Sequence, residues 1–214
     1  MKGLALLDMD GTLLSERTID VLCEKFGKAD ELKEIDERAP GMLAYEVTQE
    51  IVRLFSGINR GEMERAFGSI ALNPGVEDFL SFLTKRGFRP VIVTVSYRFL
   101  ADQLAKRLNI DLVYGNDVEF HDETFTGKLL MRYPCMKIPN CRQHSLCKLR
   151  VLLELKKAFG GTILAVGDSE ADVCMVQGAD IGVAYRPRSE ALREVAKVTV
   201  SSFKELIESL GQVF

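Results

Sequence analysis

The sequence predicts a doubly wound α/β fold, in which helices cover both faces of a parallel sheet and a small helical bundle follows the first strand. Residues 4–7 are an apolar run of strand length that ends in two carboxylates, Asp8 and Asp10. Residues 15–73 repeat apolar side chains at helical spacing and carry no strong strand pattern. From Pro74 onward strand-like and helical stretches alternate, which is typical of a parallel sheet between two helical layers.

The inserted helices are separated by turn residues. Thr18 can cap the first helix and Gly27 ends it, whereas Pro40 and Gly57 mark further breaks. A chain of 214 residues is long enough for one core domain with such an insert. The predicted parts are a core of residues 1–14 and 74–214 and a helical insert of residues 15–73.

Strands and helices of the core follow one another in order. After residues 4–7, strands are predicted at 90–95, 110–114, 163–166, 181–183 and 198–200. Helices are predicted at 74–87, 99–108, 146–159, 172–176, 190–195 and 203–210. Residues 117–127 suit a surface β-hairpin with an exposed tip at His121.

Composition excludes several classes of partner. The net charge is -3, and the basic residues are spread along the chain, so nothing indicates binding to nucleic acid or to a membrane. No apolar run suits a secretory signal or a membrane span, and the five cysteines are an odd number. We therefore expect a cytoplasmic protein without a disulfide framework, whose oligomeric state the sequence leaves open.

Polar side chains follow three predicted strands at their ends: Asp8 and Asp10, Thr94 and Ser96, Asp168 and Asp172. The carboxyl ends of parallel strands share one edge of a sheet, so we expect these groups to converge. Carboxylates crowded together need a compensating cation, and an oxygen-only set suits Mg²⁺. Lys148 could add a fixed positive charge for an anionic substrate. Together these groups would form a phosphoryl-transfer site, in which a carboxylate can be the nucleophile.

Four segments in this order carry a family resemblance: Asp8-Met9-Asp10-Gly11-Thr12, Thr94, Lys148 and Gly167-Asp168-Ser169-Glu170-Ala171-Asp172. They resemble the motifs of the haloacid dehalogenase-like phosphatase superfamily, and within it the phosphoserine phosphatase-like branch. The resemblance spans nearly the whole chain. It implies a Rossmann-like core with the helical insert as a cap, and Mg²⁺-dependent hydrolysis of a small phosphomonoester.

The resemblance also implies a role for each motif residue. Asp8 would attack phosphorus and become phosphorylated, and Asp10 would be the general acid and base. Thr94 and Lys148 would bind the phosphoryl oxygens, and Lys148 would also offset the charge of Asp8. Ser96 is an alternative hydroxyl near the mouth of the pocket. The spacing of the flanking segments favours Thr94, because no gap is then needed.

The implied magnesium site uses the same strand ends. Its ligands would be Asp8, the backbone carbonyl of Asp10 and Asp168, with Asp172 supporting the metal shell.

Two other functions are open for a site of this kind. One is a phosphotransferase or mutase that passes the phosphoryl group from Asp8 to an alcohol, and the other is a non-catalytic module that binds a phosphorylated ligand.

Substrate choice is where the chain departs from the resemblance. Arg17 stands where phosphoserine phosphatases carry a glutamate that receives the substrate ammonium, and an arginine would repel that group. Val52 and Ala171 replace an arginine and an asparagine of the family pattern. We therefore predict a substrate without that ammonium, with Arg17 among its contacts.

Three cysteines and one histidine form a separate cluster: Cys135, Cys141, His144 and Cys147. These residue types suit a structural zinc site, but their spacing is not a standard one, so a loop with buried thiols is the alternative. Cys23 and Cys174 are predicted to be core cysteines on helices.

Overall fold

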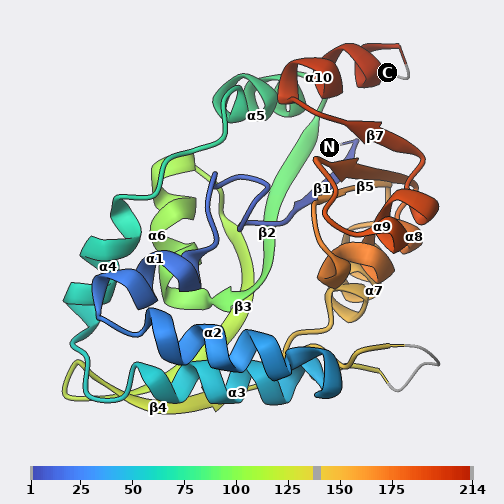
Figure 1. Ribbon diagram of the computed structural model, residues 1–214. Helices are drawn as coiled ribbons and strands as arrows, with labels where there is room; N and C mark the ends of the chain where they lie inside the picture. The colour runs from blue at the N-terminus through green and yellow to red at the C-terminus, as the bar shows by residue number, and fades with distance from the viewer. Residues whose placement is uncertain (1, 137–140, 213–214) are drawn as a thin grey trace.

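The computed structural model describes residues 2–136 and 141–212. Its centre is a seven-stranded sheet with the order β4-β3-β2-β1-β5-β6-β7, parallel throughout except for the pair β3 and β4 (Figure 1). The strands are β1 (Gly3–Leu7), β2 (Phe88–Tyr97), β3 (Leu112–His121), β4 (Thr124–Leu130), β5 (Thr162–Gly167), β6 (Ile181–Tyr185) and β7 (Val198–Val200). The predicted doubly wound fold is therefore confirmed.

The central strand β1 shows why both faces of the sheet are covered. Leu4 and Leu6 belong to one buried cluster and Ala5 and Leu7 to another, because successive side chains of a strand point to opposite faces. The first cluster lies under α7 (Lys148–Phe159), α8 (Val173–Gly178) and α9 (Glu190–Val195). The second lies under α5 (Val76–Lys85), α6 (Arg98–Leu108) and α10 (Phe203–Gly211).

Residues 15–73 contain helices and no named strand: α1 (Thr18–Lys25), α2 (Ala29–Arg38), a 3-10 turn (Ala39–Gly41), α3 (Ala44–Leu54) and α4 (Arg60–Gly68). These elements run along the left and lower sides of the molecule in Figure 1. Their apolar residues continue the cluster that covers one face of the sheet. The division into a core and a cap stays a prediction, and we keep the word cap for residues 15–73.

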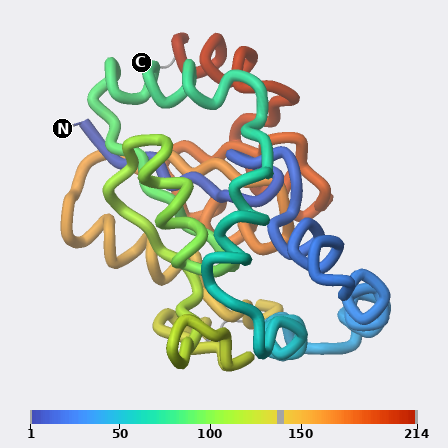
Figure 2. Tube along the Cα trace, turned by 90° about the vertical axis from the view of Figure 1, so that its left-hand side faces the viewer, coloured from blue at the N-terminus to red at the C-terminus, as the bar shows by residue number. Residues whose placement is uncertain are grey.

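The hairpin of β3 and β4 is longer than predicted and is not confined to the surface. Figures 1 and 2 both place it at the end of the molecule where α2 and α3 lie. The Phe125 ring is fully buried, and its backbone N–H donates to Ile58 O at 2.9 Å while its carbonyl accepts from Gly57 N at 2.8 Å. The hairpin therefore holds the cap against the sheet. The alternation of apolar and polar residues within 117–127 could not indicate this contact, because it says nothing about which segment the hairpin packs on.

None of the helices in residues 2–136 and 141–212 combines the length and the apolar character that crossing a bilayer requires.

Candidate active site

The first motif is held by the strand that precedes it and by a tight turn. Asp8 N–H donates to Val166 O at 3.0 Å, which continues the pairing of β1 with β5 beyond the strand end. Gly11 has a φ of +78°, and a Cβ there would lie 2.3 Å from Asp168 Oδ2. A glycine is needed at this point because the turn has a left-handed backbone and passes directly over the Asp168 carboxylate.

Asn73 fixes the turn from outside the motif. Its side-chain amide donates to Gly11 O at 3.2 Å, Thr12 O at 2.8 Å and Leu14 O at 3.0 Å. Asn73 is buried, at 5% exposed. The sequence analysis missed this residue, because a polar residue before a proline looks like any loop residue until the turn it supports is known.

Lys148 joins two carboxylates of the site. It is the first residue of α7, and its buried ammonium bonds Asp8 Oδ1 and, at 2.7 Å, Asp172 Oδ1. Burial lowers the pKa of Lys148, but the neighbouring Asp172 and Asp8 outweigh it and leave that pKa raised. The lysine is therefore a permanent cation in the cluster, and the predicted approach of Lys148 to Asp8 is present in the structure.

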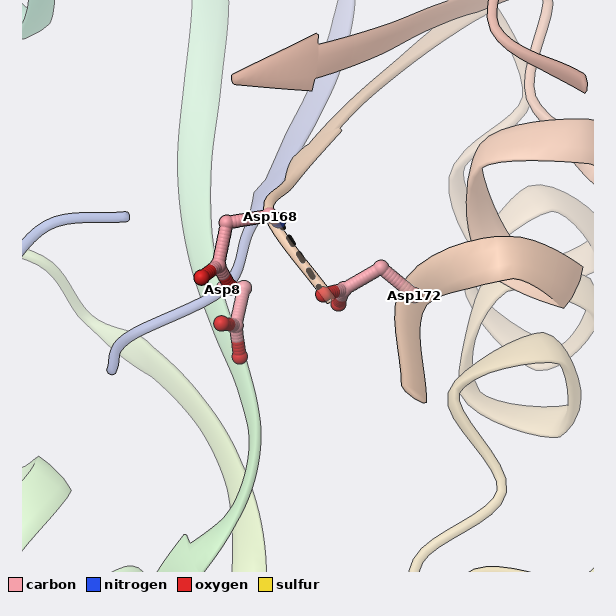
Figure 3. A group of neighbouring side chains, drawn as sticks. All are labelled: Asp8, Asp168 and Asp172. Carbon is pink, nitrogen blue, oxygen red and sulfur yellow. Dashed lines mark hydrogen bonds between the residues drawn. The ribbon is translucent and has the colours of Figure 1, made fainter. Parts of the chain in front are cut away.

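Asp172 uses its second oxygen to shape the loop after β5. Oδ2 accepts from Asp168 N–H at 3.2 Å, Ser169 N–H at 3.0 Å and the Ser169 hydroxyl at 2.9 Å. Figure 3 shows the bond to Asp168 and the side chains of Asp8, Asp168 and Asp172 pointing toward one another. Asp172 is fully buried. Because one of its oxygens bonds Lys148 and the other bonds the loop, Asp172 positions both the lysine and the loop that carries Asp168.

The same three carboxylates fit a hard divalent cation. Each offers an oxygen, and the three oxygens lie within 4.8 Å of one another. Asp168 Oδ1 is buried and has no hydrogen-bond partner among the described residues. Burial and the charge of Asp172 raise the pKa of both Asp8 and Asp168. A cation would stabilise the ionised carboxylates, and an oxygen-only set is what Mg²⁺ prefers.

Arg188 is a second cation that the sequence analysis missed. Its Nε bonds Asp168 Oδ2 at 2.7 Å, and its backbone N–H donates to Asp168 O at 2.8 Å. It lies just after β6, at the same edge of the sheet as the other site residues. The rule that strand ends converge could have identified it, had it been applied to basic side chains as well.

Asp10 is held by the first residue of the cap helix α1. Its Oδ1 accepts from Thr18 N–H at 3.1 Å and from the Thr18 hydroxyl. Burial raises the pKa of Asp10 to about 6, although the Thr18 bonds oppose this. The prediction that Thr18 caps α1 is wrong, since Arg17 occupies the N-cap position and the Thr18 side chain serves Asp10.

The two candidate hydroxyls of β2 are both buried. Thr94 is 1% exposed and Ser96 is 4% exposed, and Thr94 Oγ1 accepts from Ser96 N–H at 3.0 Å. The Ser96 hydroxyl has no hydrogen-bond partner among the described residues. Both therefore stay candidates for binding phosphoryl oxygens.

Arg17 lies at the entrance to the cap with acidic partners of its own. Its guanidinium pairs with Asp36 at 2.9 Å and with Asp20 at 3.2 Å. The charge of Arg17 also lowers the pKa of Asp10, so Arg17 lies on the Asp10 side of the site. Contact with a substrate stays a prediction for this residue.

The four residues of the predicted zinc cluster lie together, and metal binding stays a prediction. Residues 137–140 within it lie outside the described part of the chain, whereas Cys135, Cys141, His144 and Cys147 line one cavity. A hydrogen bond from Cys135 lowers the pKa of the Cys147 thiol to about 5. Cys23 is buried as predicted, but Cys174 is only partly buried and lines this same cavity.

Comparison with known proteins identifies the family. The family model for haloacid dehalogenase-like hydrolases matches residues 5–177, which is most of the chain and includes the four motifs as far as Asp172. The chain belongs to the haloacid dehalogenase-like hydrolases. The predictions of this family and of a hydrolytic enzyme are therefore confirmed.

Relatives of this hydrolase lie in the phosphoserine phosphatase-like branch. It is 30% identical over 217 residues to a phosphoserine phosphatase of Archaeoglobus fulgidus, covering 99% of this chain and 60% of that protein. It is 28% identical over 218 residues to a phosphoserine phosphatase of Streptococcus thermophilus, covering 99% of each. The chain thus spans about three fifths of the first relative and nearly all of the second.

A solved structure shows that the fold extends over nearly all of this chain. It is described as a phospho-aspartyl intermediate analogue of phosphoserine phosphatase and has a TM-score of 0.82 with 21% identity. The match covers 97% of this chain and 98% of that chain. Cap and core elements therefore have counterparts in one known fold.

Proposed function

We propose that the chain is a Mg²⁺-dependent phosphatase that hydrolyses a small phosphomonoester through a phosphoaspartyl intermediate on Asp8. The observation that carries this proposal is the buried group of Asp8, Lys148, Asp168 and Asp172. Two carboxylates of this group, Asp8 and Asp172, are bonded to a fixed ammonium, and the third, Asp168, presents a buried oxygen without a partner among the described residues. Such a site can stabilise the negative charge of a phosphoryl group during transfer.

Asp8 is the proposed nucleophile because Lys148 orients it. The ammonium bonds Oδ1, and Oδ2 is the oxygen that would attack. In the first step a bond forms between Asp8 Oδ2 and phosphorus while the bond from phosphorus to the leaving oxygen breaks. Mg²⁺, held by Asp8, the Asp10 carbonyl and Asp168 with support from Asp172, would supply positive charge beside the phosphoryl group.

Asp10 is the proposed proton carrier in both steps. It would first protonate the leaving oxygen, and it would then take a proton from the water that attacks phosphorus and releases Asp8. The Thr18 bonds hold its carboxyl in one orientation. Because Thr18 belongs to α1, movement of the cap would also affect the position of Asp10.

The decisive test replaces the nucleophile. Asp8→Asn should abolish turnover of a chromogenic phosphomonoester in the presence of Mg²⁺, because an amide cannot form the phosphorylated intermediate. Asp122→Asn is the matched control, since this aspartate is 92% exposed at the hairpin tip. Full activity of the Asp8 variant would contradict the proposal. An inactive wild-type chain that still bound phosphorylated ligands would support the non-catalytic module.

The fate of the phosphoryl group separates hydrolysis from transfer. With an acceptor alcohol added, a phosphatase should still release mainly inorganic phosphate, whereas a phosphotransferase or mutase should form a new phosphomonoester. Product analysis by ³¹P NMR distinguishes the two outcomes.

Phosphoserine is the first compound to try, because both relatives are named phosphoserine phosphatases. We infer that a phosphomonoester without an ammonium group is preferred, since Arg17 stands at the cap entrance. A panel of phosphorylated metabolites tests this inference against phosphoserine. It fails if phosphoserine gives the highest kcat/KM of the panel.

Thr94 is the proposed phosphate-binding hydroxyl. Thr94→Val keeps the shape of the side chain and should raise the KM for every phosphomonoester, whereas Ser96→Ala should change the KM less. The reverse order would transfer the role to Ser96, whose hydroxyl is free to donate among the described residues.

A further inference from the structure

Four of the five cysteines of the chain line one cavity beside the candidate active site. The cavity has a volume of about 220 Å³, and Lys148 also contributes to its wall. The cysteines are Cys135, Cys141, Cys147 and Cys174. The fifth, Cys23, is buried in α1 of the cap. The proposed phosphatase chemistry uses none of these thiols, so their gathering requires a separate explanation.

The four thiols come from separate parts of the fold and influence one another. The neighbouring thiols of Cys147 and Cys141 are among the groups that raise the pKa of Cys135. Cys147 is the N-cap residue of α7, and its backbone N–H donates to Tyr133 O at 2.7 Å, which brings the loop containing Cys135 to this helix. Cys174, on α8, has Cys141 and Cys147 among its electrostatic neighbours.

His144 lines the cavity but has different neighbours. The charges that act on it include those of Lys148, Glu170, Asp172 and Arg142. The cavity therefore holds this histidine and four cysteines, one cysteine more than the cluster predicted from the sequence.

We propose that Cys135, Cys141, Cys147 and Cys174 bind one thiophilic divalent cation of the Zn²⁺ type. Four sulfur ligands from two or more segments are a common set for structural zinc, which prefers four ligands in tetrahedral geometry. Because the ligands come from a loop, α7 and α8, the ion would cross-link three segments of the core. It would be separate from the Mg²⁺ ligands, which are all oxygen atoms.

Binding would draw the thiols inward. Sulfur ligands of one zinc ion lie about 3.7 Å apart, given a Zn–S distance of about 2.3 Å in a tetrahedral site. Among the described residues, no three of these sulfur atoms all lie within 4.8 Å of one another. The ion would therefore contract the cavity rather than enter a finished site, and metal affinity would include the free energy of that rearrangement.

The position of the cluster gives the ion a structural consequence for the active site. Cys147 directly precedes Lys148, and Cys174 lies two residues after Asp172. Arg142, next to Cys141, bonds Glu170 at 3.2 Å and donates to Ala39 O of the cap at 2.9 Å. A bound ion would thus restrain three parts of the chain. Two are the segments that carry Lys148 and Asp172, and the third is the loop of Arg142, which contacts the cap.

Metal titration of the full chain tests the proposal. The reduced, metal-stripped protein is titrated with Zn²⁺ against a chromophoric chelator, without Mg²⁺ or substrate. We expect one ion per chain. Losing a residue that only supports a metal ligand weakens binding by roughly 10- to 100-fold. Cys174→Ser removes a proposed ligand itself, so it should weaken Zn²⁺ binding by more than this. His144→Asn and the matched control Cys23→Ser should leave the affinity unchanged.

Substitution with Co²⁺ gives a readout that needs no variant. The intensity of the thiolate-to-cobalt charge-transfer absorption in the wild-type chain counts the sulfur ligands, and four are expected. This measurement keeps the proposal testable even if Cys174→Ser fails to fold. It is also independent of phosphatase activity, so a failure of the proposed function would not affect it.

Three outcomes would overturn the proposal. The first is an absence of stoichiometric Zn²⁺ or Co²⁺ binding by the reduced chain. The second is loss of affinity in His144→Asn with none in Cys174→Ser, which would restore the histidine as the ligand. The third is a Cys135–Cys147 disulfide in air together with no metal binding under reducing conditions, which would make the cavity the site of a thiol pair.

Discussion

Lys148 is the buried cation that compensates the carboxylates of the site, so Lys148→Met is the most informative perturbation. Methionine is unbranched and only one heavy atom shorter than lysine, but it removes the charge and both bonds to Asp8 and Asp172. Removing one partner of a buried ion pair costs about 3–5 kcal/mol, because the remaining charge is buried without compensation. At about 2–4 °C per kcal/mol for a protein of this size, Tm should fall by roughly 6–20 °C.

Lys156→Met is the matched control on the same helix. Lys156 also pairs with an aspartate, Asp180, at the same distance of 2.7 Å, but its side chain is 42% exposed. Exposed ion pairs contribute about 0–1 kcal/mol, because water screens them. The two variants therefore share the helix, the substitution and an ion-pair distance of 2.7 Å, and they differ in burial and in the number of paired carboxylates, two for Lys148 and one for Lys156.

Urea and thermal unfolding with and without Mg²⁺ measure this difference. Mg²⁺ should recover part of the stability of Lys148→Met, since a ligand that binds the native state at 100 times its Kd stabilises it by about 2.7 kcal/mol. The reasoning is refuted if Lys148→Met unfolds within about 1 kcal/mol of Lys156→Met in the absence of Mg²⁺. The carboxylates would then be protonated or hydrated, and Lys148 would not be compensating them.

Three further predictions concern single residues. Asp10→Asn should slow turnover by about 10²- to 10⁴-fold but keep Mg²⁺ binding by calorimetry, because an amide oxygen can still accept the Asp10 hydrogen bonds. Gly11→Ala should destabilise the fold by more than about 1 kcal/mol and reduce activity, as judged by urea unfolding and turnover. Its control, Gly57→Ala, has a similar φ of +87° but open space around the Cβ, whereas the Cβ at Gly11 would meet Asp168. Asp180 has a pKa lowered by a lysine hydrogen bond, so its stabilisation is present above the unfolded pKa of about 3.9 and is lost as pH falls through the folded value. Asp180→Asn should therefore destabilise the protein at pH 7, and the difference should shrink as the pH falls below about 3.9, in unfolding curves measured across this range.

The central part of the site could be predicted because it depends on strand order. Asp8 and Asp168 each follow an apolar run, and β1 and β5 are neighbours in the sheet. Any parallel arrangement that pairs these runs brings their carboxyl ends together. The approach of Lys148 to Asp8 needed more than this rule, and it came from the family resemblance, whereas the bond from Lys148 to Asp172 was not predicted.

Residues that support the site could not be predicted in the same way. Asn73 acts through three carbonyl groups of the turn after β1, and Arg188 acts through one carboxylate oxygen. The Asn73 contacts have no periodic or motif signal, since they depend on the path of a loop, whereas the position of Arg188 just after β6 is the one signal that could have indicated it. Cys174 was likewise not assigned to the cysteine cluster. It lies far along the sequence from Cys135 and Cys147, and it is the fold that brings it to their cavity.

The entrance to the cap shows how a local pattern can assign a residue to the wrong partner. A threonine before an apolar helical run is a favourable N-cap residue, yet Thr18 is already inside α1 and bonds Asp10. Arg17 therefore takes the N-cap position, and its side chain pairs with Asp20 and Asp36 within the cap. Two carboxylates already offset the charge of this arginine. A substrate anion would have to displace at least one of them, so the influence of Arg17 on substrate choice depends on how strongly the cap holds it.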